Sequence, residues 1–172
     1  MTDYGERIAL VTGGLRGIGR GIAERLLVEG MQVYLADIES DETAADLMQG
    51  VEGKASYLKL NVIEETQWQS VIGEIKSAKG RLDCLVNNAG VDCVGPVEEL
   101  TYENWRRIMS INVDGVFLGI KTSAPLLAET GQITPAGSSI INISSVMGKV
   151  GYIDTSAYNT SKGAVTLMSK AV

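Results

Sequence analysis

The sequence contains no histidine, two cysteines, three prolines and one phenylalanine among its 172 residues. With no histidine, and with Cys84 and Cys93 as its thiols, the chain has no plausible set of zinc ligands and no disulfide framework. We therefore expect no metal site. We expect both cysteines to be small, buried or half-buried side chains in a reducing compartment.

Basic charge and long apolar runs are also scarce. Fifteen Lys and Arg against twenty-one Asp and Glu give a formal net charge of -6, without any basic cluster, so we expect no nucleic-acid or anionic-membrane surface. No stretch approaches the ~18 apolar residues of a membrane span, and the start MTDYGERIALVTGG lacks the basic and apolar regions of a signal peptide. We expect a cytoplasmic protein.

The chain does contain enough apolar material for a core. Hydrophobic residues make up 45% of it and charged residues 21%, and its length corresponds to roughly one domain. No repeat, low-complexity tract or linker rich in Pro, Gly or Ser divides it. We expect a single domain over residues 1–172.

Apolar segments of strand length alternate with longer segments of helical character. Strands that are apolar throughout are buried on both faces, and crossover helices cover both faces of a parallel sheet. The pattern therefore predicts a doubly wound α/β fold with three layers, α/β/α. The expected strands are 7–12, 31–36, 55–60, 81–88 and 138–144, the main helical segments are 17–30, 40–49, 64–80 and 101–129, and 130–138 is expected to be a surface loop.

A glycine-rich turn follows the first expected strand and opens the first expected helix. Its glycines are spaced Gly-x-x-x-Gly-x-Gly, one residue longer in the first interval than the usual dinucleotide fingerprint. Glycines let the backbone approach a pyrophosphate, which the amides and dipole of a helix N-terminus stabilise. The turn favours a dinucleotide site, although a purely structural turn could use the same glycines. The loop residues expected at the cofactor are Gly13, Leu15, Arg16, Gly17, Ile18 and Gly19.

Asp37 follows the second expected strand, where a carboxylate can accept hydrogen bonds from the adenosine ribose of NAD. The 2′-phosphate of NADP, with a charge of about -1.5 to -2, would be repelled by that carboxylate. Arg16 is an alternative that could reach a 2′-phosphate, or it could be a solvated arginine. We expect NAD as the cofactor, with NADP less favoured.

Tyr158 and Lys162 lie four residues apart in the stretch SAYNTSK. On a helix this spacing places a phenol and an ammonium on one face. The same spacing also arises by chance on solvated helices, so the pair alone does not establish a catalytic site.

Five motifs in this order resemble the short-chain dehydrogenase/reductase (SDR) family. They are TGGLRGIG, NNAG at 87–90, Asn112 in SINVDG, INISS ending at Ser145, and YNTSK, and the resemblance runs from about Arg7 to the last residue. It implies a Rossmann fold. It also implies an NAD-dependent oxidoreductase that transfers hydride between the cofactor and a secondary alcohol or ketone.

The resemblance also implies roles for individual residues. Tyr158 would be the general acid/base, Lys162 would bind the nicotinamide ribose and stabilise the deprotonated tyrosine, and Ser145 would bind the substrate oxygen. Asn112 would support a water relay to Lys162. From the residues alone, Ser145 could be an ordinary hydroxyl and Asn112 a mid-helix amide. Further implied cofactor contacts are Asn61 and Val62, where the family more often has Asp-Val, and Asn88, Ala89 and Gly90.

Members of the family normally continue past the active-site helix. Here the sequence reaches Val172 in mid-helix, so the resemblance predicts a fold without the family's C-terminal strands and substrate lid, with 138–144 as an exposed edge strand. Two hypotheses stay open: an NAD-dependent enzyme of which this chain is a part, or a short dinucleotide-binding or partner-binding domain without competent catalysis.

Partners also follow from the resemblance. The family usually associates through two long helices, at about 103–128 and 155–172 here, so we expect a homodimer or homotetramer. The small-molecule substrate is expected to be a secondary alcohol or ketone of undefined identity, held in a mostly apolar site. The residues expected at the pocket mouth are Val91, Asp92, Cys93, Val94, Val146, Met147 and Tyr152.

Overall fold

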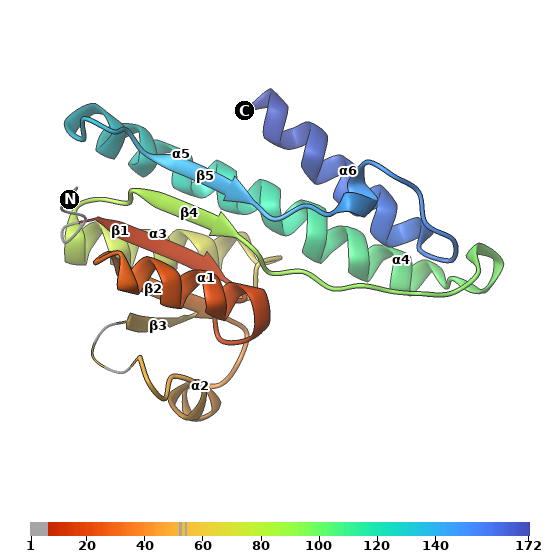
Figure 1. The fold of residues 1–172 in the computed structure, drawn as a ribbon, viewed down its shortest axis with the longest axis horizontal. Coiled ribbons are helices and arrows are strands. Elements are labelled where there is room, and N and C mark those ends of the chain that lie inside the picture. Colours follow the sequence, from red (N-terminus) through yellow and green to blue (C-terminus); the bar gives the residue numbers. More distant parts are fainter. Residues whose placement is uncertain (1–6, 52, 54) are drawn as a thin grey trace.

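The central feature of the structure is a parallel sheet with the spatial order β3-β2-β1-β4-β5 (Figure 1). The computed structural model describes residues 7–51, 53 and 55–172. Outside that part lie residues 1–6, 52 and 54. The expectation that the chain does not start with a signal peptide concerns residues 1–6 in part and lies outside the described residues to that extent. The sheet confirms the doubly wound prediction. Its strands are β1 (Ile8–Thr12), β2 (Gln32–Asp37), β3 (Ala55–Lys59), β4 (Cys84–Asn87) and β5 (Ser139–Asn142).

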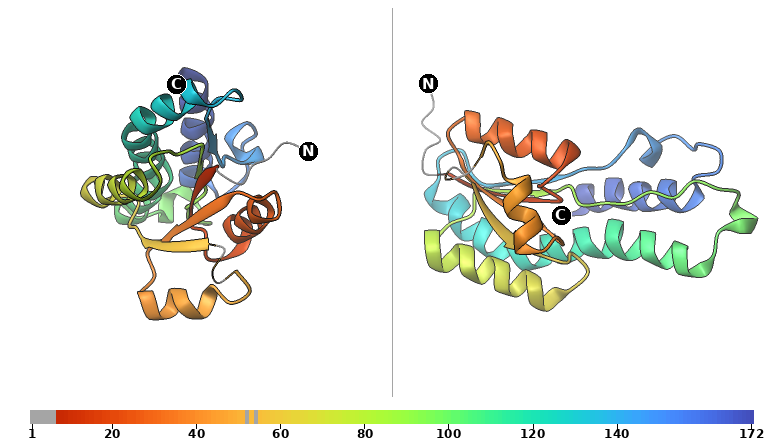
Figure 2. Two further views of the ribbon diagram at one scale, coloured as in Figure 1. Left: turned by 90° about the vertical axis from the view of Figure 1, so that its left-hand side faces the viewer. Right: turned by 90° about the horizontal axis from the view of Figure 1, so that it is seen from below.

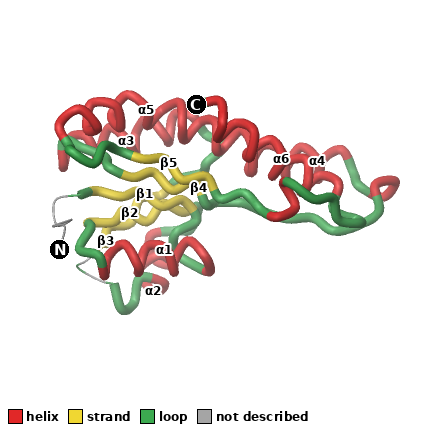
Figure 3. The backbone as a smooth tube through the Cα atoms, turned by 45° about the horizontal axis from the view of Figure 1, so that its top comes forward, coloured by secondary structure: helices red, strands yellow, loops and turns green. Residues whose placement is uncertain are grey.

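Helices cover both faces of the sheet and complete the three expected layers (Figure 3). Helices α1 and α2 pack on one face, and helices α3 and α5 pack on the other. Helix α6 packs against α5 beside β5. The helices are α1 (Gly17–Val28), α2 (Asp41–Leu47), α3 (Glu65–Lys79), α4 (Tyr102–Met109), α5 (Gly115–Ile133) and α6 (Ser156–Ala171). Short 3-10 turns are η1 (Val97–Glu99) and η3 (Val146–Gly148).

Strand β1 shows why the sequence folds into two packed faces. All five of its residues are buried, as expected for a strand that is covered on both sides. Ile8 and Leu10 join the cluster under α3 and α5, whereas Ala9 and Val11 join the cluster under α1 and α2. This period of two follows from the pleat, which points successive side chains to opposite faces.

The segment 101–129, expected to be helical, is observed as α4, a π-helical turn η2 (Ser110–Asp114) and α5. Figure 2 shows that α4 and α6 extend together beyond the end of the strands. A π-turn inserts an extra residue into the helical ladder, which changes the direction of the side chains that follow. Here it contains Asn112, one of the expected catalytic residues.

The expectation of a surface loop over 130–138 is wrong at its start, because α5 continues to Ile133. Thr130 is 1% exposed, donates a hydrogen bond to Leu126 O over 2.8 Å and accepts one from Leu82 N over 3.0 Å. Gly131 permits a close approach by Ser138, to which a Cβ at this glycine would lie 3.3 Å away. The buried hydrogen bonds of Thr130 therefore stabilise one more turn of α5. The glycine and the polar residues of this stretch are typical of a loop, so the sequence pattern does not predict that turn.

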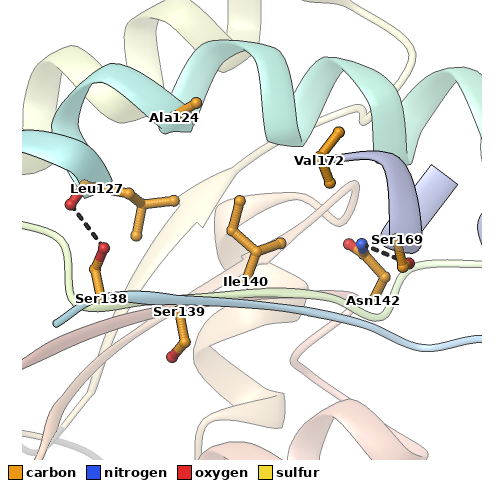
Figure 4. A pocket seen from close by; sticks show the side chains of 8 residues that line it. All are labelled: Ala124, Leu127, Ser138, Ser139, Ile140, Asn142, Ser169 and Val172. Carbon is orange, nitrogen blue, oxygen red and sulfur yellow. Dashed lines mark hydrogen bonds between the residues drawn. The ribbon is translucent and has the colours of Figure 1, made fainter. Parts of the chain in front are cut away.

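Strand β5 is the outer strand on its side of the described sheet, as expected for 138–144. A hollow of about 390 Å³ lies along it, between α5 and α6 (Figure 4). Three of its polar side chains already have partners, since Ser138 Oγ donates to Leu127 O and Asn142 Nδ2 donates to Ser169 Oγ. We therefore assign no chemistry to this hollow. None of the helices in the described ranges is long and apolar enough to cross a membrane.

Candidate active site

The turn between β1 and α1 forms an open cradle of backbone. Gly13 and Gly17 have positive φ angles of 61° and 53°, a conformation that side chains disfavour. A Cβ at Gly19 would lie 2.2 Å from Gly13 O, so the first turn of α1 can approach the loop only with glycine there. No side chain caps α1, whose N-cap residue is Arg16. The free amides and the dipole at this end suit a pyrophosphate.

A pocket of about 350 Å³ lies beside this cradle, at the carboxyl end of β2; we call it the Asp37 pocket. Its position beyond the carboxyl ends of parallel strands is where ligands bind in doubly wound folds. Both carboxylate oxygens of Asp37 accept backbone hydrogen bonds, from Leu15 N over 3.4 Å and from Ile38 N over 2.8 Å. The lining residues are Gly13, Arg16, Asp37, Ile38, Glu39, Leu60, Asn61, Val62, Ala89, Gly90, Val91 and Ile111.

Two residues of the glycine loop differ in what they can offer to a ligand. The Leu15 side chain is buried in the core under α1 and α2, so this residue could contribute only its backbone. The Arg16 side chain is 60% exposed and forms an ion pair with Glu39. Arg16 therefore lies at the mouth of the Asp37 pocket with its charge already compensated.

Tyr57 on β3 fixes the segment that follows β2, a role that the sequence analysis missed. Its hydroxyl lies 2.9 Å from Asp37 O and 2.7 Å from Glu39 O, so it can donate to either carbonyl. Burial, together with the negative charges of Asp37, Asp41 and Glu39, raises the pKa of Tyr57 to about 12. The hydroxyl thus keeps its proton, and its ability to donate, throughout the neutral range.

A second cleft, of about 450 Å³, contains Tyr158 and is called the Tyr158 cleft. It shares Gly90 and Val91 with the Asp37 pocket, so the two hollows adjoin at the segment after β4. The order of the sheet reverses between β1 and β4, which makes this the topological switch point of the fold. The cleft is lined by Ile18, Asn88, Gly90, Val91, Asp92, Ile143, Ser144, Ser145, Tyr158 and Lys162.

Tyr158 and Lys162 lie on one face of α6, as their spacing predicts. Lys162 Nζ is 5.7 Å from the centroid of the Tyr158 ring and donates a hydrogen bond to Ile143 O over 2.8 Å. The Lys162 side chain is buried, and this burial lowers the pKa of its amine below the ordinary value. The structure therefore holds a desolvated amine beside a phenol.

Ser145 reaches the same cleft from the end of the β5 segment. Its Oγ caps η3 by accepting a hydrogen bond from Met147 N over 3.1 Å. Because Oγ accepts in this contact, its O–H is a donor available to a ligand oxygen. The preceding residue, Ser144, holds the helix itself, since its hydroxyl donates to Lys162 O over 2.9 Å.

Asn112 lies behind the cleft rather than in its lining. It is 1% exposed, and its side chain makes three hydrogen bonds: Oδ1 accepts from Val91 N, and Nδ2 donates to Val91 O and to Ser161 Oγ. A Cβ at Gly90 would come within 3.2 Å of Asn112 Oδ1 and 3.5 Å of Lys162 Nζ. Gly90 thus allows three elements, the segment after β4, the π-turn and α6, to converge.

Thr12 is a further residue that the sequence analysis missed. At the end of β1, its Oγ1 accepts hydrogen bonds from Asn88 N and Ala89 N, each over 3.0 Å. Asn88 returns the contact by donating from Nδ2 to Thr12 O and Gly13 O. These bonds tie the glycine loop to the NNAG segment. The hydroxyl residue directly before the first glycine was the available signal.

The expected pocket mouth is only partly observed. Val91 and Asp92 line the Tyr158 cleft, whereas Cys93, Val94, Val146, Met147 and Tyr152 are not among its lining residues. Val94, Val146 and Tyr152 are well exposed. Val146 begins η3, whereas Val94 and Tyr152 lie in two loops that are joined by a hydrogen bond from Gly95 N to Asp154 O over 2.7 Å.

The cysteines play no part in either hollow. Both are free; Cys84 is buried and Cys93 half-buried, as expected. Burial raises the pKa of the Cys84 thiol, which disfavours its reactive thiolate. Among the described residues, no group of three or more His, Cys, Asp or Glu side chains could hold a metal ion.

A glycine cradle at a helix N-terminus and a carboxylate at the end of β2, on the edge of a doubly wound sheet where ligands bind, define a protein of the Rossmann type. Residues 7–172 match the short chain dehydrogenase family, and the chain belongs to that family.

Individual relatives agree with this membership. The chain is 38% identical to the cyclopentanol dehydrogenase of Comamonas sp. (strain NCIMB 9872) over 175 residues, which cover 99% of this chain and 67% of that protein. It is 37% identical to the NADP-dependent (R)-specific alcohol dehydrogenase of Lentilactobacillus kefiri over 174 residues, with the same coverage of 99% and 67%. This chain thus spans about two thirds of the length of these curated relatives.

The fold is also shared with solved structures. A short chain dehydrogenase/reductase from Burkholderia phymatum, crystallised in complex with NAD, matches with a TM-score of 0.88 at 30% identity. The match covers 99% of this chain and 60% of the other.

Proposed function

We propose that this chain carries the cofactor-binding and proton-transfer residues of an NAD-dependent oxidoreductase that interconverts a secondary alcohol and a ketone. The observation that carries the proposal is the buried amine of Lys162, 5.7 Å from the Tyr158 ring, in a cleft that adjoins the glycine cradle. The names of the two curated relatives, both alcohol dehydrogenases, support the substrate class.

The residues of the Asp37 pocket and the cradle suit a dinucleotide. The amides around Gly13, Gly17 and Gly19 would hold the pyrophosphate, and Asp37 would accept hydrogen bonds from the adenosine ribose. The nicotinamide ring, when bound, would supply the acceptor or donor of hydride. Further contacts in the proposal are the adenine side, Asn61 and Val62, the segment Asn88, Ala89 and Gly90, and the loop positions Leu15, Arg16 and Ile18.

Tyr158 would take the hydroxyl proton of the alcohol, or give a proton to the ketone in the reverse direction. Lys162, which lies on the same face of α6 as the phenol, would stabilise the negative charge that develops on the tyrosine oxygen during proton transfer. Lys162 would also bind the nicotinamide ribose. Its burial keeps water away from the amine and strengthens both interactions.

Ser145 and Asn112 complete the proposed machinery. Ser145 would donate its hydroxyl hydrogen to the substrate oxygen, where negative charge develops. Asn112 would hold Val91 and Ser161 in place and support a water relay to Lys162. Because three hydrogen bonds already occupy the side chain of Asn112, its first effect is to position the wall of the cleft.

The proposal also covers assembly and location. Self-association as a homodimer or homotetramer through the region of α4, α5 and α6, and a cytoplasmic location, are carried over from the sequence as expectations. Light scattering of the purified chain tests the first of them. A mass equal to that of one 18.3 kDa chain would contradict self-association.

A panel of secondary alcohols, assayed with NAD by the appearance of NADH absorbance, tests the activity. Turnover of at least one alcohol is the expected result. Binding of NADH, measured by its fluorescence, without turnover of any alcohol would favour a dinucleotide-binding domain that lacks competent catalysis. An intact mass clearly above 18.3 kDa for the native protein would identify the chain as part of a longer enzyme.

A further inference from the structure

We propose that Glu39 is a specificity-determining residue for the coenzyme and acts through Arg16. By pairing with the guanidinium, Glu39 withholds a positive charge from any phosphate on the adenosine ribose and so disfavours NADP. This inference rests on the proposed function, since it concerns which dinucleotide the chain prefers.

The charges around the Asp37 pocket motivate the inference. Among its lining residues, Arg16 is basic, and Asp37 and Glu39 are acidic. Arg16 forms its ion pair with Glu39. Both oxygens of Asp37 are instead engaged by the backbone amides of Leu15 and Ile38. Arg16, the natural partner of a 2′-phosphate, is therefore paired with Glu39. Asp37, the carboxylate proposed to face the ribose, does not pair with it.

Glu39 is held in this position by the segment that carries it. The Tyr57 hydroxyl lies within hydrogen-bond distance of the carbonyls of Asp37 and Glu39, which ties the turn after β2 to strand β3. The Glu39 side chain is 27% exposed, whereas Arg16 is 60% exposed. The carboxylate is thus the more fixed member of the pair, and the guanidinium is the member that could move.

Loss of the negative charge at Glu39 would act in two ways. Without the Glu39 carboxylate, the exposed guanidinium of Arg16 has no ion-pair partner there and can turn to pair with a phosphate instead. In addition, a phosphate of about -1.5 to -2 charge would no longer face a second carboxylate beside Asp37. Both changes favour NADPH, while NADH, which has a hydroxyl at this position, gains almost nothing from either.

The test compares the affinities of the full chain for NADH and NADPH, measured by titration of reduced-nicotinamide fluorescence without substrate. The variants are Glu39→Gln, Arg16→Ala, the double variant and Glu129→Gln. Glu129 serves as the matched control, because it also forms an exposed ion pair, with Lys76 between α5 and α3, but lines neither hollow.

We expect Glu39→Gln to tighten NADPH binding about tenfold at low salt and to change NADH binding less than about twofold, as follows from two charges at contact distance in a solvated site. The gain should shrink as salt rises, because the pair is exposed. In the double variant, in which the freed guanidinium is absent, the gain should fall to the smaller part that comes from removing the repulsive carboxylate. Glu129→Gln should leave the ratio of affinities unchanged.

Two results would overturn the inference: an unchanged NADPH to NADH ratio in Glu39→Gln, or a full gain in the double variant. Both would leave NADH binding, and with it the proposed function, intact. Failure of the wild-type chain to bind either dinucleotide is a different result, which would overturn the proposed function and this inference together.

Discussion

Asn112 donates a hydrogen bond from Nδ2 to Ser161 Oγ over 3.0 Å, and this contact joins the π-turn to the helix that carries Tyr158 and Lys162. The Ser161 hydroxyl in turn donates to Tyr158 O over 2.8 Å. Together with the two bonds between Asn112 and Val91, the contact holds one wall of the cleft and the helix beside it in a fixed relation. The position of the phenol therefore depends on a side chain outside the cleft lining.

Replacement of Asn112 by alanine should lower both stability and turnover. The change removes three hydrogen bonds made by a side chain that is 1% exposed and leaves the buried Ser161 Oγ without its donor, so we expect the free energy of unfolding to fall by about 2–4 kcal/mol. Urea denaturation gives the stability, and NADH production measured at a temperature where the variant is folded gives the activity. A fall in stability below about 0.5 kcal/mol would contradict this description of the site.

Replacement of Tyr158 by phenylalanine should remove turnover. General acid–base catalysis contributes about 10²–10⁴-fold to rate, and phenylalanine keeps the ring but cannot transfer a proton. NADH binding, followed by fluorescence, should stay within a few-fold of wild type. Tyr102→Phe is the control, because this tyrosine is 75% exposed on α4. Turnover of Tyr158→Phe close to that of wild type would refute the assigned role.

Alanine at two glycines of α1 should have opposite effects. A Cβ at Gly19 would lie 2.2 Å from Gly13 O, so Gly19→Ala should displace the cradle, weaken NADH binding at least about tenfold and cost about 1–3 kcal/mol of stability. At Gly21, where nothing lies within 4 Å of the added Cβ, alanine should stabilise the helix by about 0.5–1 kcal/mol. Fluorescence titration and thermal unfolding measure both effects. Equal NADH affinity in the two variants would argue against the cradle as the cofactor site.

Tyr57 should make stability depend on pH above pH 10. Its folded pKa of about 12 lies above the ordinary value of 10.0, so its contribution is fully present below pH 10 and is lost as pH rises through about 12. Tyr57→Phe should cost about 1 kcal/mol at pH 8 through the lost hydrogen bond, but it should lose less stability than wild type between pH 10 and 12. Urea denaturation at pH 8 and 11 compares the two, with Tyr102→Phe as control. Parallel losses in wild type and Tyr57→Phe would contradict the prediction.

The sheet was predictable from the sequence because its strands are hydrophobic runs, and such runs reflect burial directly. Every expected strand is present, although β4 begins at Cys84 rather than at 81 and β5 ends at Asn142 rather than at 144. The sequence does not predict that α5 continues to Ile133. That helix end depends on the hydrogen bond between Thr130 and Leu82, which are far apart in the chain. The π-turn escaped prediction for a similar reason: nothing local in SINVD marks it.

Side-chain partners were the least predictable part of the site. Spacing on one helix placed Tyr158 and Lys162 together, because that relation is local. By contrast, Glu39 and Tyr57 act through contacts with Arg16 and with the turn after β2, and these contacts exist only once the strands have paired. The same holds for Thr12, which meets Asn88 across neighbouring strands.

Because the strand order reverses between β1 and β4, the two hollows are lined mainly by different halves of the chain. Residues before β4 supply most of the Asp37 pocket, and residues after it supply most of the Tyr158 cleft, with Gly90 and Val91 common to both. Under the proposed function, a protein engineer would retune redox-cofactor choice through the N-terminal half and substrate scope through the C-terminal half, each with little disturbance of the other.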